Sequence, residues 1–146
     1  MPKIKNSIFI HVLIPMLIGG FIYILFRNQN LLMFRWFEFL GLDNIIRYYR
    51  EIINHNMIPF WIKYSLPDGV WVYSLTSLML IIWYNHTGKL KYFWIFFGPF
   101  FGLFLEFGQL VNIVPGTYDN MDLTLTLSAS IIPFIIFNFN LNRSSK

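Results

Sequence analysis

Four long apolar stretches, almost free of charged side chains, constrain the fold of this chain more than any other feature. They cover about residues 8–26, 67–84, 92–114 and 122–139. A helix needs about 20 apolar residues, with a range of about 17–25, to cross the hydrocarbon core of a bilayer. Of all 146 residues, 56% are hydrophobic and 12% are charged, whereas soluble domains average roughly 25% charged. A soluble domain of this size could not bury so much apolar surface, so the sequence predicts an integral membrane protein.

The first apolar stretch follows a short basic segment, an arrangement that signal peptides share. It is longer than the apolar region of a signal peptide, which is about 7–15 residues, and no A-x-A-like cleavage site follows it. We therefore expect a retained membrane helix at this position.

The segment between the first and second stretches, residues 27–66, mixes aromatic and aliphatic residues with charges. Five apolar residues recur there at helical spacing: Ile45, Ile46, Tyr49, Ile52 and Ile53. Trp, Tyr and amphipathic helices favour the membrane interface, although a connector packed on the other helices has the same pattern. The predicted fold is an all-α, integral membrane four-helix bundle. It forms a single transmembrane domain over residues 1–146, with amphipathic interfacial helices between its first and second spans.

Basic residues are concentrated in three short segments: the N-terminus, residues 85–91 and the C-terminal tail. Residues 115–121 contain no Lys or Arg. The positive-inside rule then places both termini and residues 85–91 in the cytoplasm, and residues 27–68 and 115–121 on the outer side. The chain contains no Cys and no long basic run, which excludes disulfides and thiolate metal sites and argues against nucleic acid as a partner. Membrane lipids are the expected partners, and no cofactor motif is present.

The third stretch carries an acidic residue in an apolar setting. Gly98, Gly102, Glu106 and Gln109 are spaced by four, four and three residues, so they share one face of a helix. The two glycines form a small-xxx-small patch that lets another helix approach closely. Insertion scales put an acidic residue at mid-membrane near +2.5 to +3.5 kcal/mol, so Glu106 must be neutral, partnered or beside a water-filled pocket. Polar residues of the neighbouring helices are the expected partners: Tyr73, Ser74, Thr76, Ser77, Thr124, Thr126 and Ser128.

Further polar residues are expected at the same outer membrane level as Glu106. We predict a ligand-binding pocket formed by Asp68, Glu106, Gln109, Asp119, Asn120 and Asp122. Each of these residues except Glu106 also has a structural interpretation. Asp and Asn start helices by accepting hydrogen bonds from free backbone N–H groups, and Gln109 can form polar contacts between packed helices. Oxygen ligands would suit Mg²⁺ or Ca²⁺. No His stands at ligand spacing beside the acids, so we predict no metal site.

The "ExxQ" pattern of Glu106 and Gln109, followed by Pro115-Gly116 and an acidic helix start, resembles the VanZ-like family of small bacterial membrane proteins. Asp68 also resembles an Asp of that family. Thr117 stands where the family often has an Arg, so the chain resembles a divergent member over roughly residues 66–135. The resemblance implies a protein of the bacterial inner (cytoplasmic) membrane with a role in the cell envelope. The founding member is linked to low-level glycopeptide resistance, which we do not transfer to this chain.

Three functions are compatible with these features. The first is an outward-facing pocket that binds a lipid head group, a glycolipid or a lipid-linked envelope precursor. The second is an intramembrane enzyme with Glu106 as candidate general acid or base. The third is a structural subunit that packs against a membrane protein partner or another copy of itself. The sequence contains no G-x-S-x-G motif or other pattern of nucleophilic catalysis.

Overall fold

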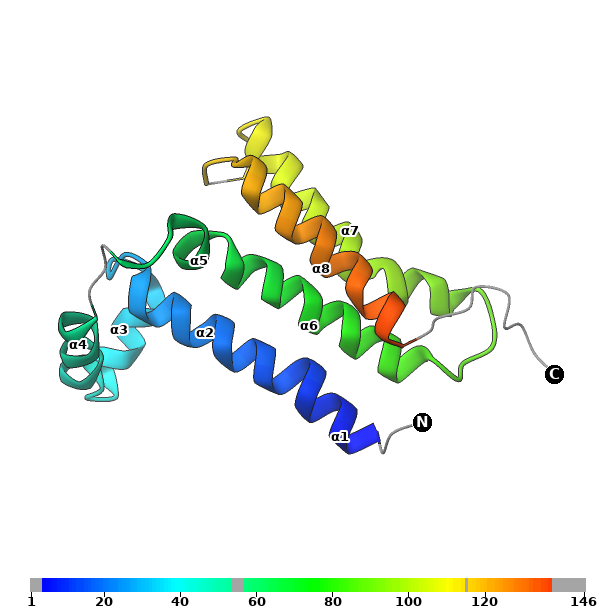
Figure 1. Cartoon of the computed structure of the whole chain (residues 1–146), viewed down its shortest axis with the longest axis horizontal. Coiled ribbons are helices and arrows are strands. Elements are labelled where there is room, and N and C mark those ends of the chain that lie inside the picture. Colours follow the sequence, from blue (N-terminus) through cyan, green and yellow to red (C-terminus); the bar gives the residue numbers. More distant parts are fainter. Residues whose placement is uncertain (1–3, 54–56, 115, 138–146) are drawn as a thin grey trace.

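The computed structural model describes residues 4–53, 57–114 and 116–137, and within these ranges the chain is helical with no strand. Figure 1 shows long helices lying side by side, with short helices gathered at one end. The elements are α1 (Ile4–Ile8), η1 (Phe9–Leu13), α2 (Ile14–Phe26), α3 (Leu32–Phe39), α4 (Asp43–Ile52), α5 (Phe60–Tyr64), α6 (Leu66–Trp83), α7 (Leu90–Leu110) and α8 (Asn120–Ile136).

Three helical segments are long and apolar enough to cross a membrane: Ile4–Phe26, Leu66–Trp83 and Leu90–Leu110. The first of these is continuous through α1, η1 and α2. The described part of α8 is a shorter apolar helix of 17 residues, at the lower limit of a spanning helix. The prediction of an all-α, apolar chain is thus confirmed, whereas a bundle of four spanning helices stays a prediction.

The first segment contains one turn of π-helix, which has a local cause. Phe9–Leu13 forms the π-helix η1, and Pro15 follows in the first turn of α2. A proline in a helix has no N–H to donate, and its ring clashes with the carbonyl four residues earlier, which here belongs to His11. The wider π-turn moves that carbonyl away, so the helix continues past Pro15 without a break.

Helix α6 is the centre of the fold, since it packs against α2 on one side and against α7 and α8 on the other (Figure 1). Small residues allow these close approaches. A Cβ placed on Gly98 of α7 would lie 3.0 Å from the backbone N of Thr76, and one on Gly69 of α6 would lie 3.2 Å from Cβ of Leu125. The predicted role of Gly98 as a helix-contact residue is therefore correct, and its partner is α6.

The distribution of side chains is the reverse of that in a soluble protein. Buried positions include Ser74, Thr76 and Ser77 of α6, whereas large apolar residues such as Leu17 and Phe100 are exposed. Small and hydroxyl-bearing residues are favoured between membrane helices, where apolar surface gains nothing by leaving lipid. This pattern supports a membrane environment independently of helix length.

Helix α7 ends earlier than the predicted boundary at residue 114. Its last residue is Leu110, and Asn112 has a left-handed φ of 58°. The N–H of Ile113 donates to Gly108 O at 2.8 Å and that of Asn112 to Gln109 O at 3.1 Å, which is the Schellman pattern of a helix end. Glu106 consequently lies about one helical turn from the end of α7.

The short helices of the 27–66 segment expose apolar side chains. In α4, Ile45, Tyr49 and Ile52 of the predicted apolar face are exposed, and Phe39 at the end of α3 is 90% exposed. Helix α4 contacts α2 and α3, but its apolar face is not buried against either. The amphipathic pattern was read correctly, and the face remains available to a surface outside this chain.

Candidate functional site

A cavity of about 560 Å³ lies at the end of the molecule where α2 ends and α6 begins. Its walls come from the end of α2, α5, the first turn of α6, the end of α7 and the residues leading into α8. The lining residues are Tyr23, Arg27, Phe60, Tyr64, Asp68, Gln109, Gly116, Thr117, Tyr118, Asp119 and Asp122. Four of the six residues predicted to bind a ligand, Asp68, Gln109, Asp119 and Asp122, therefore line a single cavity.

Glu106 does not line this cavity but lies buried next to it. Its side chain and backbone together are only 5% exposed, and the Thr126 hydroxyl of α8 hydrogen-bonds to its carboxyl group. Asp122 and Asp68 are the charged groups that act on it most strongly. Oε2 of Glu106 is buried and has no hydrogen-bond partner within the described residues. Burying a carboxyl oxygen without a hydrogen-bond donor costs free energy, and no group among the described residues offsets this cost for Oε2.

The two aspartates at the start of α8 have different roles. Asp119 is the N-cap, and its Oδ1 accepts a hydrogen bond of 3.1 Å from the backbone N–H of Met121. Asp122 lies in the first turn, where the helix dipole favours a negative charge. Its Oδ1 is buried, and the part of the chain that the structure describes offers it no hydrogen-bond donor. Asp119 thus has a structural task, whereas Asp122 has an unused acceptor beside the cavity.

Asn120, like Glu106, is a predicted site residue that does not line the cavity. It is exposed, and its Oδ1 accepts a hydrogen bond of 3.2 Å from the hydroxyl of Tyr118. This contact fixes the side chain of Tyr118, which does line the cavity. Asn120 therefore acts on the cavity through Tyr118.

Arg27 is the main site residue that the sequence analysis did not single out. Its Nη2 donates to Oδ2 of Asp68 and to the backbone O of Tyr64, both at 3.2 Å. The guanidinium lies 5.1 Å from the ring centroid of Tyr23 and 5.7 Å from that of Tyr64. Its Nε is buried with no hydrogen-bond acceptor among residues 4–53, 57–114 and 116–137. The available signal was its place directly after the first span, which brings it to the same level as Asp68.

A second arginine holds the end of α2 in position. Arg50 of α4 donates to the backbone O of Ile24 at 2.8 Å and to that of Arg27 at 2.9 Å. A cation at these carbonyls complements the negative end of the helix dipole. Burial lowers the pKa of Arg50, but a guanidinium remains protonated in proteins. This contact fixes the backbone from which Arg27 enters the site.

Gln109 is held against the turn that follows α7. A Cβ placed on Gly116 would lie 2.8 Å from Cδ of Gln109, and Gly116 has a φ of 145°. The backbone conformation favours glycine at this position, and a Cβ there would push the Gln109 side chain away. The turn thereby keeps the Gln109 amide at the cavity wall.

Most of the hydroxyl groups expected to support Glu106 have other partners. Ser74, Thr76, Thr124 and Ser128 each donate to the carbonyl four residues earlier in their own helix. The hydroxyl of Tyr73 instead lies 2.7 Å from Nδ1 of His11, on the face of α6 that packs against η1. Of the hydroxyl-bearing partners proposed from the sequence, Thr126 is the one that reaches Glu106.

The cavity offers acceptors from its carboxylates and a cation from Arg27, and it is walled by the rings of tyrosines. The described residues contain no group of three His, Asp or Glu side chains placed to hold a metal ion. A scan against protein-family models, a search of curated proteins and a search of solved structures each find no match for this chain.

Proposed function

We propose that this chain is a VanZ-like, multi-pass protein of the bacterial inner membrane whose cavity binds the polar head group of an envelope lipid or a lipid-linked precursor. In this proposal α1–η1–α2, α6, α7 and α8 are the four spans. Both termini and the 85–91 loop face the cytoplasm, because these segments carry the concentrated basic residues. The cavity then opens on the outer side.

The arrangement of elements supports this orientation. The end of α2, helix α5 and the segment between α7 and α8 meet at one end of the molecule (Figure 1). Those are the segments that the charge pattern assigns to the outer side. The exposed apolar faces of α3 and α4 lie next to this end, where they would rest in the membrane interface.

The proposal rests on two buried carboxyl oxygens, Oε2 of Glu106 and Oδ1 of Asp122, that have no hydrogen-bond partner in the described part of the chain. They belong to neighbouring helices and lie beside one cavity that also holds Asp68. Acidic groups inside a membrane protein mark functional sites by default, because their burial must be compensated. A positively charged head group in the cavity, beside Asp68 and Asp122, would supply the missing compensation.

Native mass spectrometry of the protein purified in mild detergent tests the proposal. We expect the wild type to retain lipids of the host membrane, and Asp122→Asn and Glu106→Gln to retain at least about tenfold less, as the loss of a charge-assisted hydrogen bond implies. Both substitutions keep the size of the side chain. Glu38→Gln and Asp43→Asn are matched controls, because they remove the same charges outside the cavity, from an exposed position of α3 and from a partly exposed position of α4 that pairs with Arg47.

Unchanged lipid retention in both cavity variants, with monodisperse and helical protein, would refute the proposal. Retention lost equally in the two control variants would also refute it, because the effect would then reflect overall charge.

A further inference from the structure

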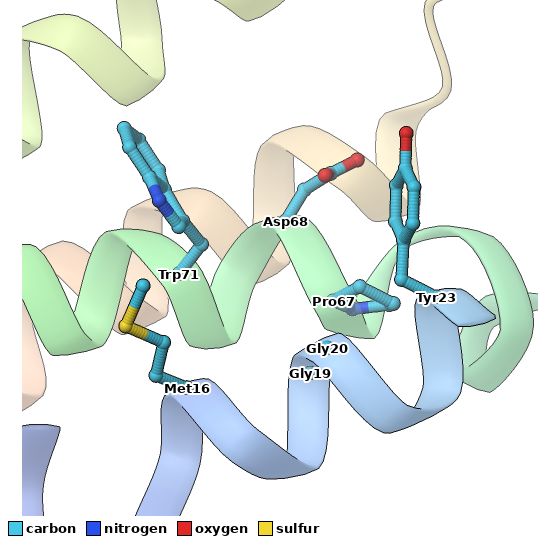
Figure 2. A pocket seen from close by; sticks show the side chains of 7 residues that line it. All are labelled: Met16, Gly19, Gly20, Tyr23, Pro67, Asp68 and Trp71. Carbon is cyan, nitrogen blue, oxygen red and sulfur yellow. The ribbon is translucent and has the colours of Figure 1, made fainter. Parts of the chain in front are cut away.

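A second, apolar cavity adjoins the carboxylate-lined cavity. It has a volume of about 240 Å³ and lies between α2 and α6. Its lining residues are Met16, Gly19, Gly20, Tyr23, Pro67, Asp68 and Trp71. Figure 2 shows Gly19 and Gly20 on α2 facing Pro67 on α6, with the side chains of Met16 and Trp71 toward one end of this groove.

The groove runs from the site toward the interior of the membrane. Tyr23 and Asp68 line both cavities, and in Figure 2 their side chains point to the same side of the groove. Tyr23 is three residues before the end of α2, whereas Met16 lies seven residues further from that end, which corresponds to about 10 Å along the helix. The polar end of the groove is thus at the helix ends, and the apolar end lies deeper in the span.

A third cavity of about 450 Å³ adds positive charge on the other side of Tyr23. It is lined by Arg27 and Arg50 together with Tyr23, Tyr64 and three further residues. Arg27 and Tyr64 also line the carboxylate-lined cavity. A basic region and an acidic region therefore meet at Arg27, and Tyr23 lines both of these cavities and the apolar groove.

We infer that the site binds a phospholipid with a primary amine in its head group, with one acyl chain in the groove between α2 and α6. This inference rests on the proposed function and names its ligand class. The phosphate lies at Arg27, whose buried Nε has no acceptor among the described residues. The ammonium group lies among Asp68, Asp119 and Asp122, which line the carboxylate-lined cavity, and its charge compensates the acidic cluster that includes Glu106.

The head group and the acyl chain have separate roles. An acyl chain gains little by moving from the bilayer into an apolar groove, because both environments are equally apolar. The groove therefore orients the lipid, and the choice among lipids depends on the head group. An ammonium group presents three N–H donors, which suits several separate carboxylate acceptors better than the hydroxyls of a glycerol head group.

Trp71 is a natural reporter for the groove, because it is 39% exposed and lines it. The experiment reconstitutes the full chain in nanodiscs that mix phosphatidylethanolamine and phosphatidylglycerol, with brominated acyl chains on one lipid at a time. Bromine quenches nearby tryptophan fluorescence. The contribution of Trp71 is the difference between wild type and Trp71→Phe.

We expect brominated phosphatidylethanolamine to quench Trp71 more strongly than brominated phosphatidylglycerol at equal mole fraction. A charge-assisted hydrogen bond to Asp122 corresponds to about a tenfold preference between the two lipids. Asp122→Asn should abolish the preference. Gly20→Leu should also abolish it by filling the groove, since a Cβ at Gly20 meets nothing within 4 Å and the substitution therefore fits. Ile18→Phe, which adds bulk on an exposed position of the same helix, should leave the preference intact.

Equal quenching by the two lipids would overturn the inference. Equal quenching by brominated phosphatidylcholine, which has the positive charge but no N–H donor, would overturn the assignment of a primary amine. If the mass spectra still show lipid retention that depends on Asp122, the proposed function stands and only the ligand class is wrong. If that retention is absent as well, the proposed function fails with the inference.

Discussion

Replacing Gly98 by alanine should destabilise the packing of α7 on α6, because the added Cβ would lie too close to Thr76. The added Cβ would lie 2.7 Å from Oγ1 of Thr76, 3.0 Å from its backbone N and 3.2 Å from its Cα. Thr76 cannot easily turn away, because its hydroxyl donates to Val72 O at 2.8 Å and the residue is fully buried. Two of the three contacts are with backbone atoms, so relief requires the two helices to separate.

The magnitude follows from two opposing effects. Overfilling a well-packed contact costs about 1–3 kcal/mol. Replacing glycine by alanine within a helix stabilises the helix by about 0.8–1.0 kcal/mol where the methyl group has space. Gly20→Ala measures this gain alone, because a Cβ there has nothing within 4 Å. The two variants should therefore differ by about 1–3 kcal/mol, which is about a fivefold to 150-fold difference in the unfolding equilibrium.

Gly102→Ala should fall between these two variants. The nearest atom to its added Cβ is a methyl carbon of Val72 at 2.7 Å, followed by a methyl carbon of Thr126 at 3.1 Å. Side-chain methyl groups can shift by a few tenths of an ångström, whereas the backbone at Thr76 cannot move without its helix. We expect the order of stability to be Gly20→Ala, wild type, Gly102→Ala and Gly98→Ala.

Reversible unfolding by SDS in mixed micelles, followed by circular dichroism, measures these free energies. Thr76→Ala should relieve part of the cost of Gly98→Ala, because it removes the 2.7 Å contact and leaves the backbone contacts. The reasoning is refuted if Gly98→Ala is as stable as Gly20→Ala. Full rescue by Thr76→Ala would show that the backbone contacts cost nothing, which also contradicts the argument.

Three further changes test other parts of the structure with the same unfolding measurement. Asp119→Ala should cost about 0.5–2 kcal/mol because it removes the N-cap of α8, and Asp119→Ser should restore most of the loss; equal stability of both would contradict the capping role. Asn112→Val should cost about 1–2 kcal/mol because a branched side chain is strained at a φ of 58°, whereas Asn112→Gly should be tolerated. Tyr73→Phe should cost about 1 kcal/mol through the lost 2.7 Å hydrogen bond to His11, and a variant as stable as the wild type would show that this bond has no net value.

From the sequence, Asp119, Asn120 and Asp122 share the same two interpretations, ligand binding or the start of α8. The structure separates their tasks: Asp119 caps α8, Asn120 binds Tyr118, and Asp122 keeps a buried oxygen without a donor among the described residues. At the start of a helix, the side chains of consecutive residues point in different directions. The exact position of the first helical residue therefore decides which side chain is the N-cap. Glu106 was expected to have several hydroxyl partners, but most serine and threonine hydroxyls bond to their own helix, as they can in any helix.

The sequence alone determined the helical, membrane-type character of the chain and the common face of Gly98, Gly102 and Glu106. Both follow from composition and from the 3.6-residue period, which act within a single segment. The tertiary structure decided that Arg27 meets Asp68, 41 residues away, and that Tyr23 joins an apolar groove to a carboxylate-lined cavity. Such pairings depend on which helices are neighbours and on how closely their small residues let them approach. A periodic pattern places a residue on one face of its own helix, but it does not give the distance from that residue to a neighbouring helix.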